Sequence, residues 1–303
     1  MVSPIVMLEA VVIAGPTAAG KSQLALDLAA RLGGEIVNAD AMQVYAPLRV
    51  LTARPSAADE AQTPHHLDGI ASGSERWSAG RFAREAAPIC QAIAERGATP
   101  IIVGGTGLWL RALTEGLSPI PAIGEEMISV GTKRLEELGM AAFREEVLTN
   151  DPDMAWLNPA DTQRHLRAWA VFQKTGQPLS VWQAAPPEPV IPMRVRGVVL
   201  SPPREVLYAR CDARFEAMMA AGAMEEVSAL LALGLDPSLP VMRAVGVGPL
   251  TDYLNGALSK EAAIELAQRD TRRLAKRQLT FFKNQLPQWP IIEDVETAAA
   301  HLL

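Results

Sequence analysis

A glycine-rich stretch, G-P-T-A-A-G-K-S at residues 15–22, constrains the fold of this chain more than any other feature. It fits the phosphate-binding pattern G-x-x-x-x-G-K-[ST] at every fixed position. An apolar segment, residues 9–14, precedes it and is typical of a short buried strand, whereas residues 23–32 are good helix formers. Strand, glycine loop and helix in this order predict a P-loop, in which backbone N–H groups and a helix N-terminus surround a phosphate group.

The residue types in the loop indicate distinct roles. Glycines let the backbone approach a phosphate group closely, Lys21 supplies a positive charge, and the hydroxyl of Ser22 can bind Mg²⁺. A chance match in a glycine-containing turn is the alternative, which the flanking strand and helix disfavour. The expected phosphate-binding residues are Gly15, Pro16, Thr17, Ala18, Ala19, Gly20, Lys21 and Ser22.

Strands and helices are expected to alternate along the chain outside one central segment. The further expected strands are 35–38, 98–103, 196–201 and 289–293. The expected helices outside that segment are 23–32, 79–96, 203–221, 223–233 and 260–285. Residues 54–80 have the composition of a loop. This alternation predicts an α/β protein with a P-loop NTPase-like parallel sheet flanked by helices.

The central segment, residues 121–192, lies between two proline-rich breakers and contains no convincing strand. Its expected helices are 125–139, 141–148, 152–157 and 160–174. Because strand signals resume directly after it, we interpret it as an all-helical insertion domain. The catalytic core would then comprise residues 1–120 and 193–303.

Two polar residues follow expected strands. Asp40 comes after the strand at 35–38, and Thr106 comes after Gly104-Gly105 at the end of the strand at 98–103. In open α/β sheets, ligands bind beyond the carboxyl ends of the strands, so both side chains can face the P-loop. The alternatives are that Asp40 is a helix cap or a surface turn residue, and that Thr106 caps the helix that begins near Leu108.

Composition and charge indicate the class of protein and its compartment. The chain has 303 residues, 49% of them hydrophobic, and a formal net charge of −6. No apolar run approaches the ~20 residues of a membrane span, and the two cysteines, Cys90 and Cys211, are expected to be reduced core thiols. We therefore expect a cytoplasmic monomer that does not bind membranes. Basic residues nevertheless cluster between 269 and 283, where Asp270 is the only acid.

The usual equipment for transfer of a γ-phosphate is incomplete. Most P-loop proteins that perform this chemistry carry an acidic residue after a second buried strand to hold Mg²⁺. Here the strand at 98–103 ends in Gly104-Gly105 without an acid. Asp40 follows a different strand.

A series of motifs, taken in order, resembles the bacterial tRNA dimethylallyltransferases (tRNA isopentenyltransferases). The resemblance extends from about Val11 to Phe282, and the combination of motifs is much more specific than the P-loop alone. The motifs are G-P-T-A-A-G-K-S (15–22), N-A-D-A-M-Q-V-Y (38–45), H-H-L (65–67), W-S-A-G-R-F (77–82), I-I-V-G-G-T-G-L-W (101–109), D-T-Q-R-H-L-R-A (161–168), R-A-V-G (243–246) and T-R-R-L-A-K-R-Q-L-T (271–280).

The resemblance implies transfer of a dimethylallyl group from dimethylallyl diphosphate to N6 of the adenosine at tRNA position 37, beside the anticodon. The P-loop would then hold the leaving diphosphate, with Ser22 binding Mg²⁺. Asp40 would be the general base, and Thr17, Lys21 and Thr106 would belong to the catalytic site. Arg214 is the arginine expected to bind diphosphate, and Arg210 is the alternative.

The resemblance also implies contacts with the tRNA anticodon stem-loop. The residues implied are Asp40, Ala41, Met42, Gln43, Thr106, Gln163, Arg164, His165, Leu166, Arg167, Arg243, Lys276, Arg277, Gln278 and Lys283. For Arg164 and Arg167 the alternative is a solvated helix face. The chain departs from the family at Ala41 (commonly Ser), Ala46 (commonly Arg) and Val247-Gly248 (usually Tyr-Arg), which are positions that concern tRNA contact more than the transfer chemistry.

Three other functions remain as alternatives: a P-loop kinase or NTPase, a prenyltransferase that acts on free adenine nucleotides, and an RNA-binding protein without activity. The insertion and the basic segment at 269–283 favour a polymeric acceptor over a free nucleotide. The presence of Lys21, Ser22, Asp40 and Thr106 together disfavours a protein without activity.

Overall fold

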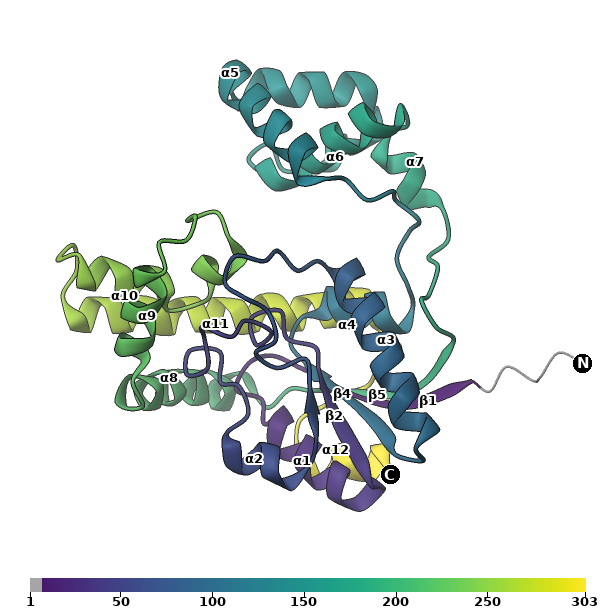
Figure 1. Ribbon diagram of the computed structural model, residues 1–303, viewed down its shortest axis with the longest axis vertical. Coiled ribbons are helices and arrows are strands. Elements are labelled where there is room, and N and C mark those ends of the chain that lie inside the picture. The colour runs from purple at the N-terminus through teal and green to yellow at the C-terminus, as the bar shows by residue number, and fades with distance from the viewer. Residues whose placement is uncertain (1–6) are drawn as a thin grey trace, which may run out of the picture. The chain divides into compact units, whose positions relative to one another are not determined.

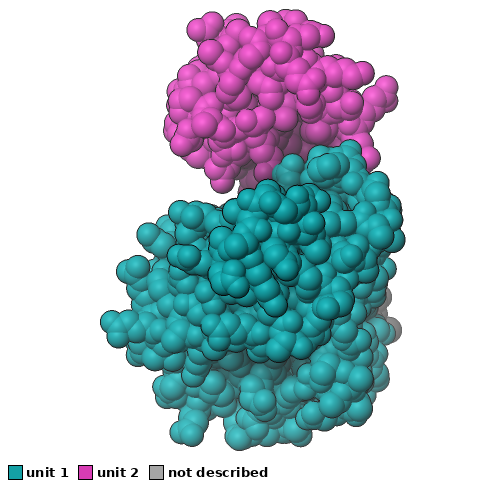
Figure 2. Space-filling view, turned by 90° about the vertical axis from the view of Figure 1, so that its left-hand side faces the viewer, with its two compact units in different colours: residues 1–114, 190–303 teal, residues 115–189 magenta. Residues whose placement is uncertain are grey.

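The computed structural model describes residues 7–303, which form two compact units (Figure 1). The first unit contains the described residues up to Thr114 together with Val190–Leu303, and the second contains Glu115–Pro189 (Figure 2). The predicted insertion, 121–192, starts and ends slightly later along the chain than the second unit. Residues 1–6 of the predicted core lie outside the described residues.

The first unit is built on a six-stranded parallel sheet with the order β3-β2-β4-β1-β5-β6. β1 lies inside the sheet, paired with β4 on one side (Val11 with Ile101) and with β5 on the other (Val11 with Arg196). The strands are β1 (Leu8–Ala14), β2 (Gly34–Asn38), β3 (His65–His66), β4 (Thr99–Gly104), β5 (Met193–Leu200) and β6 (Ile291–Ile292). The predicted fold class, a P-loop-like parallel sheet with flanking helices, is confirmed.

Helices cover both faces of this sheet because its strands are apolar on both sides. Val11 and Ile13 of β1 share a buried cluster with α1 (Lys21–Leu32) and α12 (Val295–Leu302). The intervening Val12, also fully buried, points to the opposite face. Helix α3 (Ala79–Glu95) contacts β1, β2 and β4 but contributes nothing to that cluster, so it covers this second face.

Most of the remaining helices of the first unit lie at the carboxyl edge of the sheet, whereas α2 lies beside α1 (Figure 1). Helix α11 packs against α8, α10 and α4. The elements are α2 (Ala57–Gln62), α4 (Gly107–Thr114), α8 (Arg204–Ala220), α9 (Ala223–Ala232), the 3₁₀ helix η2 (Pro240–Arg243), α10 (Val247–Leu254) and α11 (Lys260–Gln285).

The second unit is all helical and has its own core. It contains α5 (Glu125–Asn150), the 3₁₀ helix η1 (Pro152–Trp156), α6 (Thr162–Thr175) and α7 (Leu179–Ala184). Phe143, Trp169 and Val171 are central members of its hydrophobic cluster. Gly139 interrupts α5 with φ 72° and ψ 162°, and it separates segments that correspond to the two predicted helices 125–139 and 141–148.

The structure corrects several sequence-based expectations. Residues 54–80, predicted to be a loop, contain α2 and the two-residue strand β3, which pairs with β2 through His65 and His66. Helices α7, α10 and α12 were not predicted. Within residues 7–303, no helix is both long enough and apolar enough to cross a membrane.

Candidate active site

The P-loop connects β1 to α1 at the carboxyl edge of the sheet. Gly15 has φ +152°, and a Cβ there would lie 2.3 Å from the carbonyl oxygen of Leu200 at the end of β5. Gly20, with φ +103°, is the N-cap of α1. Both positions are therefore restricted to glycine: the first by close packing on a neighbouring strand, the second by a left-handed conformation that side chains disfavour.

Two basic side chains, Lys21 and Arg214, lie at the loop. The Lys21 ammonium donates to the carbonyl oxygen of Pro16 (2.7 Å), and the Arg214 guanidinium donates to Oγ1 of Thr17 (3.3 Å). Burial, helped by the nearby Arg214 charge, lowers the pKa of Lys21 to about 8, although Asp40 opposes the shift. Burial likewise lowers the pKa of Arg214. Two desolvated cations side by side make a site that favours an anion.

The structure distinguishes between the two candidate arginines of α8. Arg214 reaches the P-loop, whereas Arg210, one turn earlier, is exposed to solvent. The geometry therefore favours Arg214 as the anion-binding arginine.

Asp40 lies in a tight turn directly after β2. Asn38 fixes this turn: its Oδ1 accepts from the Asp40 N–H (2.8 Å), and its Nδ2 donates to the carbonyl oxygens of Asp40 (3.2 Å) and Leu67 (3.0 Å). Oδ1 of Asp40 accepts from the N–H of Met42 (2.9 Å). Within the described residues Oδ2 makes no hydrogen bond, so half of this half-buried carboxylate is open to a ligand.

Thr106 is packed against the same turn. Its hydroxyl oxygen accepts from the N–H of Ala41 (2.9 Å), and its own N–H donates to the carbonyl oxygen of Ala39 (3.3 Å). A Cβ on Gly104 would lie 2.1 Å from that same carbonyl oxygen, which explains a glycine at this position. Because the Thr106 oxygen already accepts, its hydroxyl proton can be donated to a ligand.

Gln278, for which the family resemblance implies a tRNA contact, points from α11 into this site. Its Oε1 accepts from the N–H of Thr17 (2.9 Å), and its Nε2 donates to the carbonyl oxygen of Gly105 (3.0 Å). The amide therefore joins the P-loop to the loop that carries Thr106.

The remaining residues with predicted tRNA contacts in the first unit fall into two groups. Ala41 and Met42 are half-buried beside Asp40, and the Gln43 amide donates to the carbonyl oxygens of Thr52 and Ala53, which anchors the segment after β2. The other group is exposed to solvent and consists of Arg243, Lys276, Arg277 and Lys283.

In the second unit the predicted contact segment begins α6. Arg164 is exposed and pairs with Asp161 (2.7 Å). His165 is fully buried, so its side chain does not lie on the surface, whereas Leu166 is half-buried and packs against the hydrophobic core of this unit. Arg167 is half-buried, and burial alone lowers the pKa of its guanidinium. Gln163 is exposed.

Asn38 is a site residue that the sequence reasoning missed. A polar side chain at the buried end of β2, two residues before the candidate base, is the signal that could have identified it. Its amide reaches both Asp40 and Leu67, so it locks the turn that presents the carboxylate.

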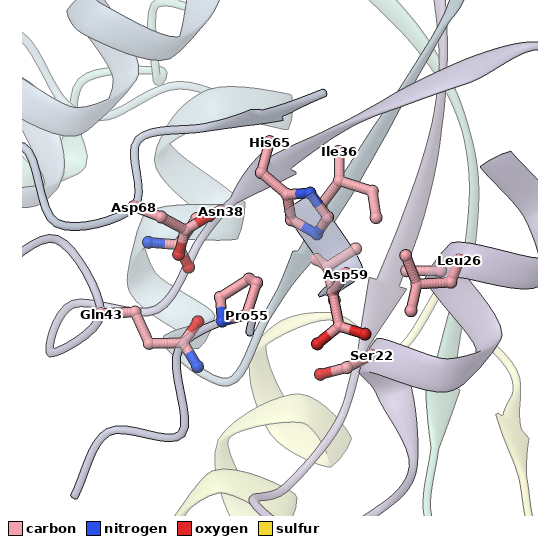
Figure 3. Close-up of a pocket in the computed structure, with 11 residues that line it drawn as sticks. Ser22, Leu26, Ile36, Asn38, Gln43, Pro55, Asp59, His65 and Asp68 are labelled. Atoms are coloured by element: carbon pink, nitrogen blue, oxygen red, sulfur yellow. The ribbon is translucent and has the colours of Figure 1, made fainter. Parts of the chain in front are cut away.

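A pocket adjoins the P-loop at Ser22 and lies between α1, the end of β2 and the 55–68 segment (Figure 3). Burial raises the pKa of Asp68 in its lining to about 7, against the attraction of Arg54. The described residues contain no cluster of three or more His, Cys, Asp or Glu side chains that could hold a metal. Ser22 is exposed at the first turn of α1, so a Mg²⁺ ion there would take its other ligands from phosphate oxygens and water, as this ion commonly does.

Comparisons with known proteins agree on one family. The model for IPP transferase matches residues 43–285, and that for isopentenyl transferase matches residues 8–66. A tRNA dimethylallyltransferase of Rhodospirillum centenum is 52% identical over 90% of this chain and 88% of its own length. The protein of the same name from Phenylobacterium zucineum is 50% identical over 92% of this chain and 90% of its own length.

Solved structures are similar over most of both chains. The full-length tRNA isopentenylpyrophosphate transferase of Bacillus halodurans has a TM-score of 0.68 at 31% identity and covers 97% of this chain and 93% of its own. A eukaryotic dimethylallyltransferase, solved while acting on tRNA, has a TM-score of 0.78 at 28% identity and covers 92% of this chain and 71% of its own.

Proposed function

We infer that this chain, which belongs to the IPP transferase family, transfers a dimethylallyl group from dimethylallyl diphosphate to N6 of the adenosine at tRNA position 37. The products are N6-isopentenyladenosine and diphosphate. One observation supports this chemistry above all: the P-loop, Arg214 and the half-open carboxylate of Asp40 meet at the carboxyl edge of the sheet.

The cationic half of the site suits the leaving group. As the allylic C–O bond breaks, positive charge develops on the allyl carbon and negative charge on diphosphate. Lys21, Arg214 and the P-loop amides stabilise that anion most strongly as it forms, which lowers the barrier. The hydroxyl of Thr17 accepts from Arg214 and so has its proton to donate to a diphosphate oxygen.

The carboxylate suits the nucleophile. The lone pair of an adenine amine is delocalised into the ring, so the amine attacks effectively only as it loses a proton. Asp40 has one oxygen held by Met42 and the other available to take that proton while the new N–C bond forms. N6 thus gains the allyl carbon, diphosphate leaves with the bonding electrons, and the proton passes to Asp40.

Mg²⁺ is the metal that we propose for this reaction, held to the protein by Ser22. When bound, it neutralises charge on the diphosphate oxygens.

The acceptor is a tRNA anticodon stem-loop. The target base must leave the stack of the loop to reach Asp40, so we propose that it is extruded. The exposed basic residues of α11 and α6 are suited to phosphate contacts, which carry shape rather than sequence information. We further propose that the enzyme acts as a cytoplasmic monomer; its buried free thiols, Cys90 and Cys211, fit a reducing compartment.

The test is incubation of the protein with labelled dimethylallyl diphosphate, Mg²⁺ and an anticodon stem-loop that carries adenosine 37. We expect label on the RNA, none on a stem-loop with guanosine 37, and labelling that is slower by ~10²–10⁴ with the variant Asp40→Asn. Labelling of free AMP instead of RNA would indicate an adenylate prenyltransferase, and ATP consumption without the prenyl donor would indicate a kinase or NTPase. Relatives named as tRNA enzymes favour neither alternative.

A further inference from the structure

We propose that Gln278 is a positioning residue that holds the P-loop and the Thr106 loop in one fixed arrangement, and that it is not a tRNA contact. This assignment rests on the proposed function, because the two loops carry the groups that act on the donor. The side chain makes two hydrogen bonds of ordinary length, one to each loop: it accepts from the N–H of Thr17 (2.9 Å) and donates to the carbonyl oxygen of Gly105 (3.0 Å).

The glycine at 105 provides independent support. A Cβ there would lie 2.3 Å from Nε2 of Gln278, and also 3.4 Å from the carbonyl oxygen of Gly15 at the start of the P-loop. The absence of a side chain at 105 therefore makes room for the Gln278 amide, whereas the Gly15 oxygen would be at ordinary contact distance. The double glycine serves two different contacts, since Gly104 instead approaches Ala39.

The rest of α11 fixes where this amide lies. Ala275 and Phe282 on the inward side of the helix are fully buried, and a Cβ on Gly107 would lie 2.2 Å from the ring of Phe281. The helix is thus tightly packed one turn before and one turn after Gln278. Its exposed side carries basic residues that are available to RNA, among them Lys276, Arg277 and Lys283.

An amide is the chemistry that this position requires. One end must accept a hydrogen bond from a backbone N–H, and the other must donate to a backbone carbonyl; glutamate cannot donate when ionised, and leucine can do neither. Because the N–H of Thr17 donates to Gln278, it is not available to the prenyl donor. Thr17 can therefore bind the donor only through its hydroxyl. Gln278 and Arg214 together therefore decide where that hydroxyl points.

Loss of the Gln278 amide should therefore impair turnover rather than the binding of RNA. Misplacement of reacting groups by about 1 Å can cost ~10²-fold in rate. We expect Gln278→Leu, in which the new side chain has a similar size, to lower kcat by about that factor. The KM for the stem-loop, and the Kd for RNA measured in the absence of the prenyl donor, should stay within about twofold of wild type. The matched comparison is Arg277→Leu on the exposed face, which should show the opposite pattern, with a raised RNA Kd and a raised KM for the stem-loop.

Two further variants keep the proposal testable if Gln278→Leu folds poorly. Gln278→Glu loses the donor to Gly105 when ionised and regains it when protonated, so its activity relative to wild type should rise as the pH is lowered. Gly105→Ala should displace the Gln278 amide, and the double variant Gly105→Ala/Gln278→Ala should be no slower than Gln278→Ala alone. Such non-additivity is expected only of groups that act through one contact.

The outcomes separate this proposal from the proposed function. If the wild type labels the stem-loop but Gln278→Leu weakens RNA binding and retains kcat, Gln278 is a tRNA contact and the assignment is wrong. Additive effects of the Gly105 and Gln278 substitutions would also overturn it. If the wild type labels no RNA at all, it is the proposed function that fails.

Discussion

At the residue scale, the turn that presents Asp40 permits a clean test of the base. In the variant Asp40→Asn the side-chain oxygen can still accept from the N–H of Met42, and Asn38 still fixes the turn. The fold should therefore persist, whereas the group that we propose takes the proton from N6 is lost. We expect a fall of ~10²–10⁴ in the rate of transfer. Single-turnover labelling measures it, with an unchanged melting temperature as the control. Near-normal transfer by the folded variant would remove Asp40 from the mechanism.

The lowered pKa of Lys21 predicts how donor binding depends on pH. With a pKa of about 8 in the free protein, Lys21 is protonated below pH 8 and increasingly neutral above it. A bound diphosphate favours the charged form and raises that pKa, so binding takes up a proton and weakens as the pH rises above about 8. Calorimetry in buffers of different ionisation enthalpy should detect about half a proton taken up per donor at pH 8, since Lys21 is half protonated there.

The control for this measurement is Lys21→Met, which cannot titrate. Its weaker binding should lack the part of the proton uptake that is due to Lys21. Equal uptake by both proteins would mean that Lys21 does not face the diphosphate.

At the element scale, the P-loop could be predicted because its conformation depends on the residue type at a few positions. Steric constraints require glycine at positions 15 and 20. Because these constraints give a short motif, the motif can be identified without knowledge of the rest of the fold. The choice between Arg210 and Arg214 could not be made in the same way. The two residues lie one turn apart on the same helix, so periodicity treats them alike, and only the packing of α8 against the P-loop separates them.

The missed elements have specific causes. β3 has two residues and is defined by its pairing with β2 rather than by any pattern of its own. Helix α10 carries Gly248 and Pro249, which read as breakers but lie in its first turn, where proline is tolerated. For α12 a signal existed: Asp294 caps the helix by accepting from the N–H of Thr297 (2.7 Å).

Gln278 illustrates a limit of motif matching. The motif places it among basic residues, whereas the structure turns its amide inward to Thr17 and Gly105, on the side of α11 away from Lys276 and Arg277. Neighbours in a motif therefore need not share a role. His165 is a second example, since it is buried within a segment that resembles an RNA-contacting one.

The segment after Tyr45 offers a test of an element held by one side chain. The Glu226 carboxylate on α9 accepts from three successive backbone N–H groups, those of Arg49, Val50 and Leu51. In Glu226→Gln, an amide NH₂ must face at least one of these donors. We expect a loss of roughly 1–3 kcal/mol of unfolding free energy, as for other polar groups left without a partner.

Urea unfolding measures this loss, and Glu225→Gln is the matched control. Glu225 also lies in the first turn of α9, where both charges interact with the helix dipole, but it is exposed. If both variants lost the same stability, the effect would belong to the helix dipole and not to the 49–51 segment.

At the scale of the whole molecule, an acidic protein must bind a polyanion. The formal net charge is −6, yet the exposed side chains of α11 include Lys276, Arg277 and Lys283. The local charge, rather than the net charge, determines the affinity for RNA, because salt screens the field of each charge beyond a Debye length of about 8–10 Å. The two units each carry part of the predicted contact surface, so variants in both are needed to test it.

Salt dependence is the sharpest measurement of that surface. Each phosphate that a basic side chain neutralises releases counterions, so log K for RNA should fall with log salt by ~0.7 to 0.9 per contact. We therefore expect Arg164→Ala, Arg167→Ala and Lys276→Ala each to reduce the slope by about one contact and to raise the KM for tRNA. Donor affinity should be unchanged, because none of the three side chains hydrogen-bonds to a P-loop residue. Arg31→Ala, which removes an equal charge from the last turn of α1, is the control. If all four variants kept the wild-type slope, the arginines of α6 and Lys276 would be ordinary solvated side chains, and the phosphates would be bound elsewhere on the protein.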